Sequence, residues 1–248
     1  MEAQPKYDGT WVVLPTYNEI ENLPNVAPAI LAALPGSTLF VVDDSSPDGT
    51  GELADKMAAT DPHVRVMHRT EKQGLGKAYI AGFQAALEQG AQRIVQMDSD
   101  GSHDPKYLPS LVDNLAKYDL VLGSRYVKGG GVRNWGLMRR FVSRGGSMFA
   151  RAVLLLRPHD LTGGFKAWRR DTLAALPWTS LHSGGYVFQI ETTYRAQRAG
   201  ARIKEVPIIF VDRQLGASKM SRRIIVEALA VVVRLRWEEL RGRLRRGS

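Results

Sequence analysis

The sequence predicts an α/β fold in which helices cover both faces of a mostly parallel central sheet. Two observations predict it. Short apolar runs alternate with longer helical stretches through the first half of the 248 residues, and polar clusters follow four of the apolar runs. This alternation is typical of parallel sheets, which bind ligands beyond the carboxyl ends of their strands. With 44% hydrophobic residues, the chain can build a substantial core.

The individual elements follow from the apolar pattern. Strands are expected at the short apolar runs Thr10–Leu14, Thr38–Asp43, Val64–His68, Ile94–Met97 and Leu120–Leu122. Helices are expected between them at Glu19–Ala33, Thr50–Ala59, Gly76–Gln89 and Pro105–Lys117. Beyond a glycine-rich joint at 129–131, we expect an arginine- and aliphatic-rich segment at Leu137–Leu156 broken at Gly145-Gly146, a helix at Gly185–Arg198, one or two strands in Ile203–Val211 interrupted by Pro207, and a long helix at 221–246.

Composition excludes several classes of protein. There is no cysteine, which excludes disulfides, thiolate metal sites and cysteine nucleophiles. The N-terminus lacks the apolar core of a signal peptide, and no stretch reaches the ~18 apolar residues of a membrane-spanning helix. The net charge of +9 is uneven, because the last 30 residues carry nine Lys or Arg and three Glu. Such a basic end suggests an anionic partner, although a solvated tail without a role is also common.

The pair Asp98 and Asp100 is the most informative feature of the chain. Both follow the apolar run 93–97, and residues i and i+2 of an extended segment point the same way. Two carboxylates so placed suit Mg²⁺ or Mn²⁺, which leave positions open for phosphate oxygens. A helix-capping turn is the alternative and, for this motif alone, the commoner structure.

Seven motifs in order resemble the family 2 glycosyltransferases, and more narrowly the dolichol-phosphate mannose synthases and their bacterial polyprenyl-phosphate relatives. The matching stretches are Pro15–Glu19, Val42–Thr50, Gly74–Gly76, Asp98–Asp100 with His103 and Pro105, Gly123–Tyr126, Thr162–Phe165, and Asp212-Arg213 with Gly216–Lys219. They cover nearly the whole chain. The resemblance implies a GT-A (Rossmann-like) fold, Mg²⁺ or Mn²⁺, and inverting transfer of mannose from GDP-mannose to a polyprenyl monophosphate.

The resemblance also implies a donor site. Its residues are Pro15, Tyr17, Glu19, Val42, Asp44, Asp98, Ser99, Asp100, Arg213 and Lys219. Asp98 and Asp100 would hold the metal on the diphosphate, and Ser102 stands where some relatives carry a further ligand. Ser102 could equally cap the helix that begins near Pro105, with water completing the metal site. For Asp43 we favour a turn at the strand end.

On the acceptor side, the resemblance implies a phosphate site at Arg125, Arg139 and Ser143. Arg139 and Ser143 are i and i+4 neighbours on a helix, but Arg140 and Arg144 share this spacing, so the register could differ by one. A phosphate monoester is largely dianionic at neutral pH, so no strong general base is required. The expected catalytic residues are therefore Asp100, Arg125 and Asp160.

Asp160 would orient the nucleophile, although it could instead cap the loop at Thr162 or Gly163. Glu191 reads as one half of a buried structural pair, and we assign no chemistry to His103.

The acceptor lipid requires a membrane surface. The last helix carries apolar residues at spacings of three and four, which are Val226, Leu229, Val233, Trp237, Leu240 and Leu244. A charged face accompanies them, as in interfacial helices, although such a stripe more commonly packs on a protein core. We expect a glycosyltransferase domain at 1–220 that includes an interfacial segment at about 136–157, and a basic amphipathic helix at 221–248. Together these segments would bind the cytoplasmic face of a membrane peripherally, with a membrane-protein partner possible.

Three other functions stay open to different degrees. A polyprenyl-phosphate glucosyltransferase using UDP-glucose would share the fold and the metal. A nicotinamide-dependent enzyme is disfavoured, because Pro15–Glu19 stands where a Gly-x-Gly-x-x-Gly loop would follow the first strand. A membrane-surface module without catalysis is permitted by the basic end. Nucleic acid is not an expected partner, because carboxylates at four strand ends would repel it.

Overall fold

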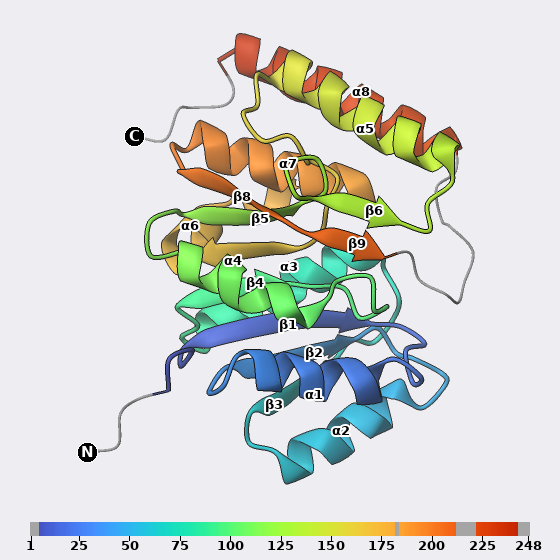
Figure 1. The fold of residues 1–248 in the computed structure, drawn as a ribbon, viewed down its shortest axis with the longest axis vertical. Helices are drawn as coiled ribbons and strands as arrows, with labels where there is room; N and C mark the ends of the chain where they lie inside the picture. The colour runs from blue at the N-terminus through green and yellow to red at the C-terminus, as the bar shows by residue number, and fades with distance from the viewer. Residues whose placement is uncertain (1–4, 182–183, 212–221, 243–248) are drawn as a thin grey trace.

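The computed structural model describes residues 5–181, 184–211 and 222–242. Its centre is a seven-stranded sheet in the order β3-β2-β1-β4-β7-β5-β8 (Figure 1). The strands are β1 Thr10–Thr16, β2 Thr38–Asp43, β3 Val64–His68, β4 Arg93–Gln96, β5 Leu120–Ser124, β7 Lys166–Arg169 and β8 Ile203–Pro207. All neighbours pair in parallel except β7, which runs antiparallel to both β4 and β5. The mostly parallel sheet is thus confirmed.

Helices cover both faces of this sheet. They are α1 Leu23–Ala33, α2 Thr50–Thr60, α3 Leu75–Glu88, α4 Leu108–Asn114, α5 Leu137–Leu154, α6 Arg170–Ala174, α7 Gly185–Arg198 and α8 Arg222–Leu240, with 3-10 turns at Pro105–Tyr107 and Trp178–Ser180. Alternate strand residues enter two cores. In β1, Val12 and Leu14 pack with α1, α2 and α4, whereas Trp11 and Val13 pack with α3, α6 and α7.

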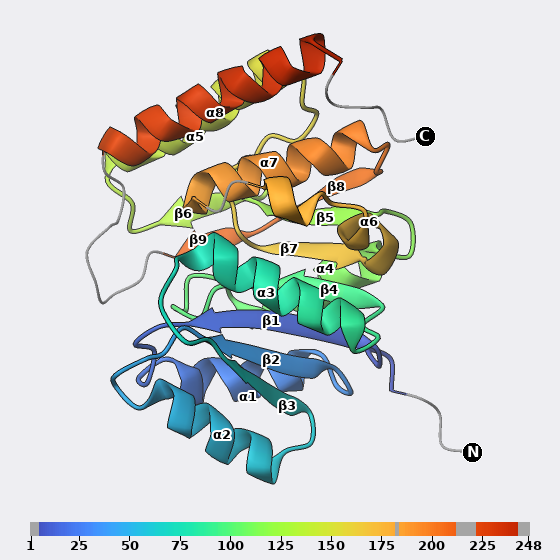
Figure 2. The ribbon, with the colours of Figure 1, turned by 180° about the vertical axis from the view of Figure 1, so that it is seen from behind.

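A third core joins α5 and α8 to the outer side of α7. Ala150 of α5, Ile190 and Tyr194 of α7, and Val232 and Leu235 of α8 form this cluster. The two helices run side by side along one end of the molecule (Figures 1 and 2). The last helix therefore buries one face against the domain, and none of the described helices has the length and apolar character to cross a bilayer.

Several expected boundaries were wrong. No break occurs at Gly145-Gly146: α5 runs through both glycines to Leu154, and Leu155 ends it in the left-handed conformation (φ 54°). Two helical glycines cost about 1 kcal/mol each relative to alanine, which the packing of neighbouring turns can offset. The first helix begins at Leu23 rather than Glu19, because residues 19–22 form turns before Pro24.

Strand β7, helix α6 and a short strand at Gly131–Arg133 were not expected, whereas the strand at Ile209–Val211 lies within the expected range Ile203–Val211. Strand β7 is the sequence Lys-Ala-Trp-Arg, whose charged ends hide its central position in the sheet. Strands β6 Gly131–Arg133 and β9 Ile209–Val211 form a separate parallel pair. Because β7 is antiparallel, the residues that precede it reach the same edge of the sheet as the carboxyl ends of β1, β4 and β5.

Candidate functional site

A cavity of about 500 Å³ opens at this edge of the sheet. Its walls come from the loops after β1, β2, β4 and β5, the loop before β7, and the starts of α3 and α7. Among the expected site residues, those that line it are Pro15, Tyr17, Glu19, Asp44, Asp98, Ser99, Asp100, Ser102, Arg125 and Arg139. This volume is typical of a small-molecule site. Most of the expected donor residues and the two expected acceptor arginines therefore share one cavity.

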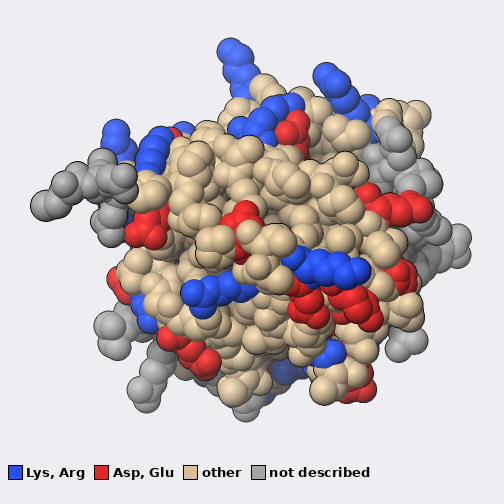
Figure 3. Space-filling model, turned by 90° about the horizontal axis from the view of Figure 1, so that it is seen from below, with Lys and Arg blue, Asp and Glu red and all other residues tan. Residues whose placement is uncertain are grey.

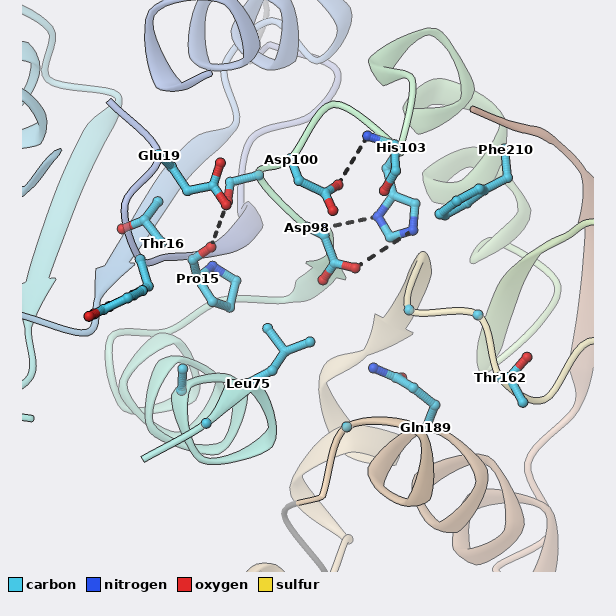
Figure 4. A pocket seen from close by; sticks show the side chains of 18 of the residues that line it. Pro15, Thr16, Glu19, Leu75, Asp98, Asp100, His103, Thr162, Gln189 and Phe210 are labelled. Carbon is cyan, nitrogen blue, oxygen red and sulfur yellow. Dashed lines mark hydrogen bonds and ion pairs between the residues drawn. The ribbon is translucent and has the colours of Figure 1, made fainter. Parts of the chain in front are cut away.

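The Asp98–Asp100 segment forms the floor of the cavity (Figure 4). Ser99 Oγ donates to Pro15 O at 3.0 Å, which ties the segment to the loop after β1. Asp100 Oδ1 accepts from Ser102 N at 3.1 Å, as in the turn that was the alternative interpretation. The carboxylates of Asp98 and Asp100 nevertheless both face the cavity, so the turn and a ligand-binding pair coexist.

These residues fit a divalent cation. Ser102 Oγ is buried, lines the cavity and has no hydrogen-bond partner among the described residues. An unsatisfied buried hydroxyl beside two carboxylates is the oxygen-rich donor set that Mg²⁺ or Mn²⁺ prefers. The described residues contain no group of three or more His, Asp or Glu side chains placed to hold an ion, so Asp98 and Asp100 would not bind it with a third such side chain. The remaining ligands would be Ser102, water and phosphate oxygens.

His103 is a site residue to which the sequence assigned no chemistry. Its ring is buried, stacks on Phe165 with centroids 4.8 Å apart, and lines the cavity. Its Nδ1 accepts from Asp98 N at 3.0 Å, and its Nε2 lies 4.0 Å from Asp98 Oδ2 (Figure 4). Burial lowers the pKa of His103. The ring is therefore neutral at pH 7, with its proton on Nε2 facing the carboxylate.

The loops after β1 and β2 build the side of the cavity where the nucleotide is expected. Glu19 Oε2 accepts from Asn22 Nδ2 at 2.6 Å, and Glu19 N donates to Thr50 Oγ1. Lys72 Nζ lies 3.3 Å from the centre of the Tyr17 ring, a cation–π contact that the sequence did not suggest. Both residues line the cavity. The side chains of this loop are thus held before any ligand binds.

Asp44 forms an ion pair with Arg69, a residue outside the expected set. Burial raises the pKa of Asp44, and the guanidinium opposes this shift. Asp43 accepts from Thr16 Oγ1 and from both N and Oγ of Ser46, so the turn interpretation of Asp43 is confirmed. Val42 is fully buried beneath α3 and does not line the cavity. Arg213 and Lys219 lie outside the described residues.

Arg125 and Asp160 form a buried, bidentate pair where the acceptor phosphate is expected. Arg125 Nε and Nη2 donate to the two carboxylate oxygens at 2.7 and 2.6 Å, and Nη2 also donates to Thr162 Oγ1. Arg125 lines the cavity, but Asp160 lies behind it. The suggested cap on Thr162 or Gly163 does not form; Asp160 instead accepts from the backbone and side chain of Arg125.

Helix α5 carries both pairs of residues that could form the expected acceptor-phosphate site. Arg139 lines the cavity, with its guanidinium 4.4 Å from the centre of the Trp135 ring. Ser143 is buried and hydrogen-bonds with Thr162 Oγ1 and Tyr126 OH. Arg140 and Arg144 are exposed, and Arg140 donates to Val132 O. Arg139 therefore lines the cavity and Ser143 is buried beside Thr162, whereas Arg140 and Arg144 face outward.

Glu191 does not take part in the cavity. It is buried and pairs with Arg195 at 2.6 Å, which confirms the structural pair that its place in an apolar helix suggested.

Comparison with known proteins agrees with this geometry. Residues 11–176 match the family described as glycosyl transferase family 2. The chain is 51% identical over 236 residues to an undecaprenyl-phosphate mannosyltransferase of Micrococcus luteus, covering 94% of this chain and 97% of that protein. It is 48% identical over 239 residues to a polyprenol monophosphomannose synthase of Mycolicibacterium smegmatis, covering 96% and 89%.

Solved structures with low sequence identity share the fold. A mannosyltransferase from Pyrobaculum calidifontis in complex with GDP-Man and Mn²⁺ superposes with a TM-score of 0.60 at 19% identity, covering 94% of this chain and 67% of that one. Glucosyl-3-phosphoglycerate synthase from Mycobacterium tuberculosis gives 0.63 at 22% identity, covering 92% and 79%. The expected GT-A-like fold is thus confirmed, and the chain belongs to glycosyl transferase family 2.

Proposed function

We propose that this chain transfers mannose from GDP-mannose to a polyprenyl monophosphate, with inversion at the anomeric carbon. One observation carries the proposal: a single cavity is lined by the Asp98–Asp100 pair on one side and by Arg125 and Arg139 on another. Transfer between two phosphate-bearing substrates needs both kinds of group within reach of one sugar. Two relatives, each about half identical to this chain, are a mannosyltransferase of undecaprenyl phosphate and a polyprenol monophosphomannose synthase, which supports mannose and a polyprenyl phosphate as the group transferred and the acceptor.

On the donor side, the cation-binding residues are Asp98, Asp100 and Ser102. A bound Mg²⁺ or Mn²⁺ would neutralise charge that develops on the departing diphosphate. The carboxylates of Asp98 and Asp100 face the cavity, where they would hold the cation. Ser99 fixes their segment to the Pro15 loop. Tyr17, Glu19 and Asp44 then face the nucleoside from the loops after β1 and β2.

On the acceptor side, Arg125 and Arg139 bind the lipid phosphate. The phosphate attacks without a general base, because its second pKa is about 6 and it is dianionic at neutral pH. Asp160 acts through Arg125: both carboxylate oxygens hold the guanidinium in place. Asp160 is thus a positioning residue rather than the group that orients the nucleophile directly.

The lipid reaches this cavity from a membrane that contacts α5 and α8. Among the described residues, the exposed large hydrophobic side chains other than Ile20 and Leu75 lie on these two helices or at Leu155, which ends α5. The most exposed are Leu137 (83%), Phe141 (76%) and Met138 (74%) at the start of α5, in the same turns as Arg139. Part of the expected surface faces inward instead: Phe149, Val153, Leu154 and Leu156 pack in the third core.

The charge of α5 supports the same orientation. Four arginines and no acidic residue lie within Leu137–Leu154, which favours an anionic lipid surface. Figure 3 shows the end of the molecule opposite α5 and α8, where Lys and Arg side chains lie among Asp and Glu side chains. That end offers no comparable basic surface in the view.

The test is transfer of labelled sugar to a polyprenyl phosphate, with GDP-mannose and UDP-glucose compared, in the presence and absence of Mg²⁺ or Mn²⁺. We expect sugar to be transferred from GDP-mannose but not from UDP-glucose. The transfer should require the cation and should be lost in Asp100→Ala. Asp113→Ala is the matched control, because it removes an aspartate whose ion pair with Lys6 lies on the exposed surface. Transfer from UDP-glucose would replace the proposed donor, and undiminished transfer by Asp100→Ala would contradict the proposed metal site.

A further inference from the structure

We infer that Tyr79 is a positioning residue that fixes the Asp98 carboxylate for cation binding, with His103 as its counterpart. Tyr79 is fully buried, and its OH donates to Asp98 Oδ1 at 2.6 Å. It does not line the cavity, so it would reach a ligand only through Asp98. The inference rests on the proposed function in one respect, that Asp98 is a cation ligand.

The fold leaves the Tyr79 ring little freedom. The ring packs between Phe83 and Phe188, with centroids 5.4 and 6.2 Å away. Helix α3 itself is pressed against the sheet at Gly82, where a Cβ atom would lie 2.5 Å from Val13 Cγ1. The hydroxyl is therefore aimed at the end of β4 by two aromatic neighbours and by a helix that cannot move closer.

Asp98 is held from two directions. Tyr79 donates to Oδ1, whereas Nε2 of His103 lies 4.0 Å from Oδ2 and Nδ1 of His103 accepts from the Asp98 backbone. The Asp98 side chain keeps 27% of its surface exposed toward the cavity. Each carboxylate oxygen has two lone pairs, so an oxygen that accepts a hydrogen bond can also bind a cation. Hydrogen bonds of this kind orient metal-binding carboxylates, and removing one typically costs about 10- to 100-fold in metal affinity.

A buried tyrosine hydroxyl could also donate to a carboxylate only to satisfy its own hydrogen bond. Tyr194 provides the matched comparison. It is likewise fully buried, and its OH donates to Glu239 Oε2 at 2.9 Å, in the third core. Replacing either tyrosine with phenylalanine keeps the ring and removes one hydroxyl beside one carboxylate. A structural role would affect stability alone in both variants.

The experiment measures Mn²⁺ binding to the full chain in the presence of GDP, from the electron paramagnetic resonance signal of free Mn²⁺. We expect Tyr79→Phe to weaken Mn²⁺ binding about 10- to 100-fold, and Tyr194→Phe to change it less than about twofold. Transfer by Tyr79→Phe should recover as Mn²⁺ is raised, because the defect is in affinity. Unchanged Mn²⁺ affinity in Tyr79→Phe would overturn the inference while leaving the proposed function intact. Absence of Mn²⁺ binding by the wild type would overturn both.

Thermal unfolding without Mn²⁺ checks that both variants are folded. If Tyr79→Phe does not fold, His103→Asn tests the same arrangement from the other side of Asp98. The amide oxygen of the new asparagine can still accept from the Asp98 backbone, but the substitution removes the ring nitrogen Nε2 that lies near Asp98 Oδ2. Mn²⁺ affinity within about twofold of the wild type in that variant would also contradict the inference.

Discussion

Asp160 holds Arg125 with both carboxylate oxygens and is itself held from behind, since its backbone N–H donates to Glu205 Oε1 at 2.9 Å. The pair is almost wholly buried, with 4% of the Arg125 side chain and none of the Asp160 side chain exposed. Arg125 alone reaches the cavity. The loop acid that was expected to orient the nucleophile thus contacts a cationic side chain and holds it in place.

Replacing Asp160 with asparagine should raise the KM for the lipid phosphate and lower the stability. Breaking a buried ion pair leaves a charge without compensation, at a cost of up to about 3–5 kcal/mol. The control is Asp119→Asn, which weakens the more exposed ion pairs with Arg202 and Arg169 at the far end of β5 and should lower the stability less than Asp160→Asn, without changing the acceptor KM. Urea unfolding and steady-state kinetics distinguish the two. An unchanged acceptor KM in folded Asp160→Asn would show that Arg125 does not bind the phosphate.

Two neighbouring arginines on α5 test the helix register. Arg139 lines the cavity against Trp135, whereas Arg140 is exposed. Arg139→Gln should raise the acceptor KM at least tenfold, because a charge-assisted contact contributes about 1.5–3 kcal/mol. Arg140→Gln removes the same charge one residue away and should leave KM within about threefold when the acceptor is presented in neutral detergent. Equal effects of the two variants would indicate a general charge effect instead of a phosphate site.

The apolar surface of α5 should govern binding to lipid. Changing Leu137, Phe141 and Met148 to serine removes exposed side chains without touching the third core. The affinity for vesicles containing anionic lipid, measured by sedimentation, should fall at least tenfold, because burying each of these side chains contributes about 1.5 kcal/mol or more. Ile20→Ser, at an exposed hydrophobic position elsewhere, is the control.

These substitutions are a cleaner test than removing the last helix, since Val232 and Leu235 of α8 belong to a core that truncation would open. Retained binding by the triple variant would show that α5 does not face the membrane.

Replacing a glycine with alanine should have opposite effects on stability at Gly82 of α3 and at Gly145 of α5. A Cβ at Gly82 would lie 2.5 Å from Val13 Cγ1 and 2.9 Å from Val42 Cγ2, whereas nothing lies within 4 Å of a Cβ at Gly145. Gly82→Ala should therefore destabilise the protein by about 1–3 kcal/mol through overpacking. Gly145→Ala should stabilise it by about 0.5–1 kcal/mol, because alanine favours helix. Urea unfolding measures both, and destabilisation by Gly145→Ala would mean that α5 bends at this point.

The sequence predicted what depends on local pattern. The parallel strands are short apolar runs. The Asp98–Asp100 pair was expected from the two-residue period of an extended segment, but β4 ends at Gln96 and Ser99 and Asp100 lie in a bend, so both residues reach the cavity from the loop that follows the strand. Strand β7 was missed because Lys166 looks like a surface residue until it is known to be buried against α7. Tyr79 and Lys72 were missed because their partners lie 19 and 55 positions away and are brought together by α3 and its preceding loop.

Lys166 should make stability depend on pH. Its Nζ is fully buried and donates to Gln189 O, Thr192 Oγ1 and Thr193 Oγ1, and burial lowers the pKa of Lys166 to about 7. In the unfolded chain the pKa returns to the ordinary lysine value of about 10.4. Between these two values the unfolded state binds one more proton than the folded state, so the free energy of unfolding rises with pH, by at most about 1.4 kcal/mol per pH unit.

Below pH 7, Lys166 is protonated in both the folded and the unfolded state, so it no longer makes the free energy of unfolding depend on pH. Lys166→Met should abolish the rise above pH 7, whereas Lys204→Met, at an exposed lysine on β8, should retain it. Urea unfolding of the three proteins at pH 6, 7, 8 and 9 gives the slopes. Parallel slopes for the wild type and Lys166→Met would mean that the three acceptors keep the ammonium charged inside the protein throughout this range.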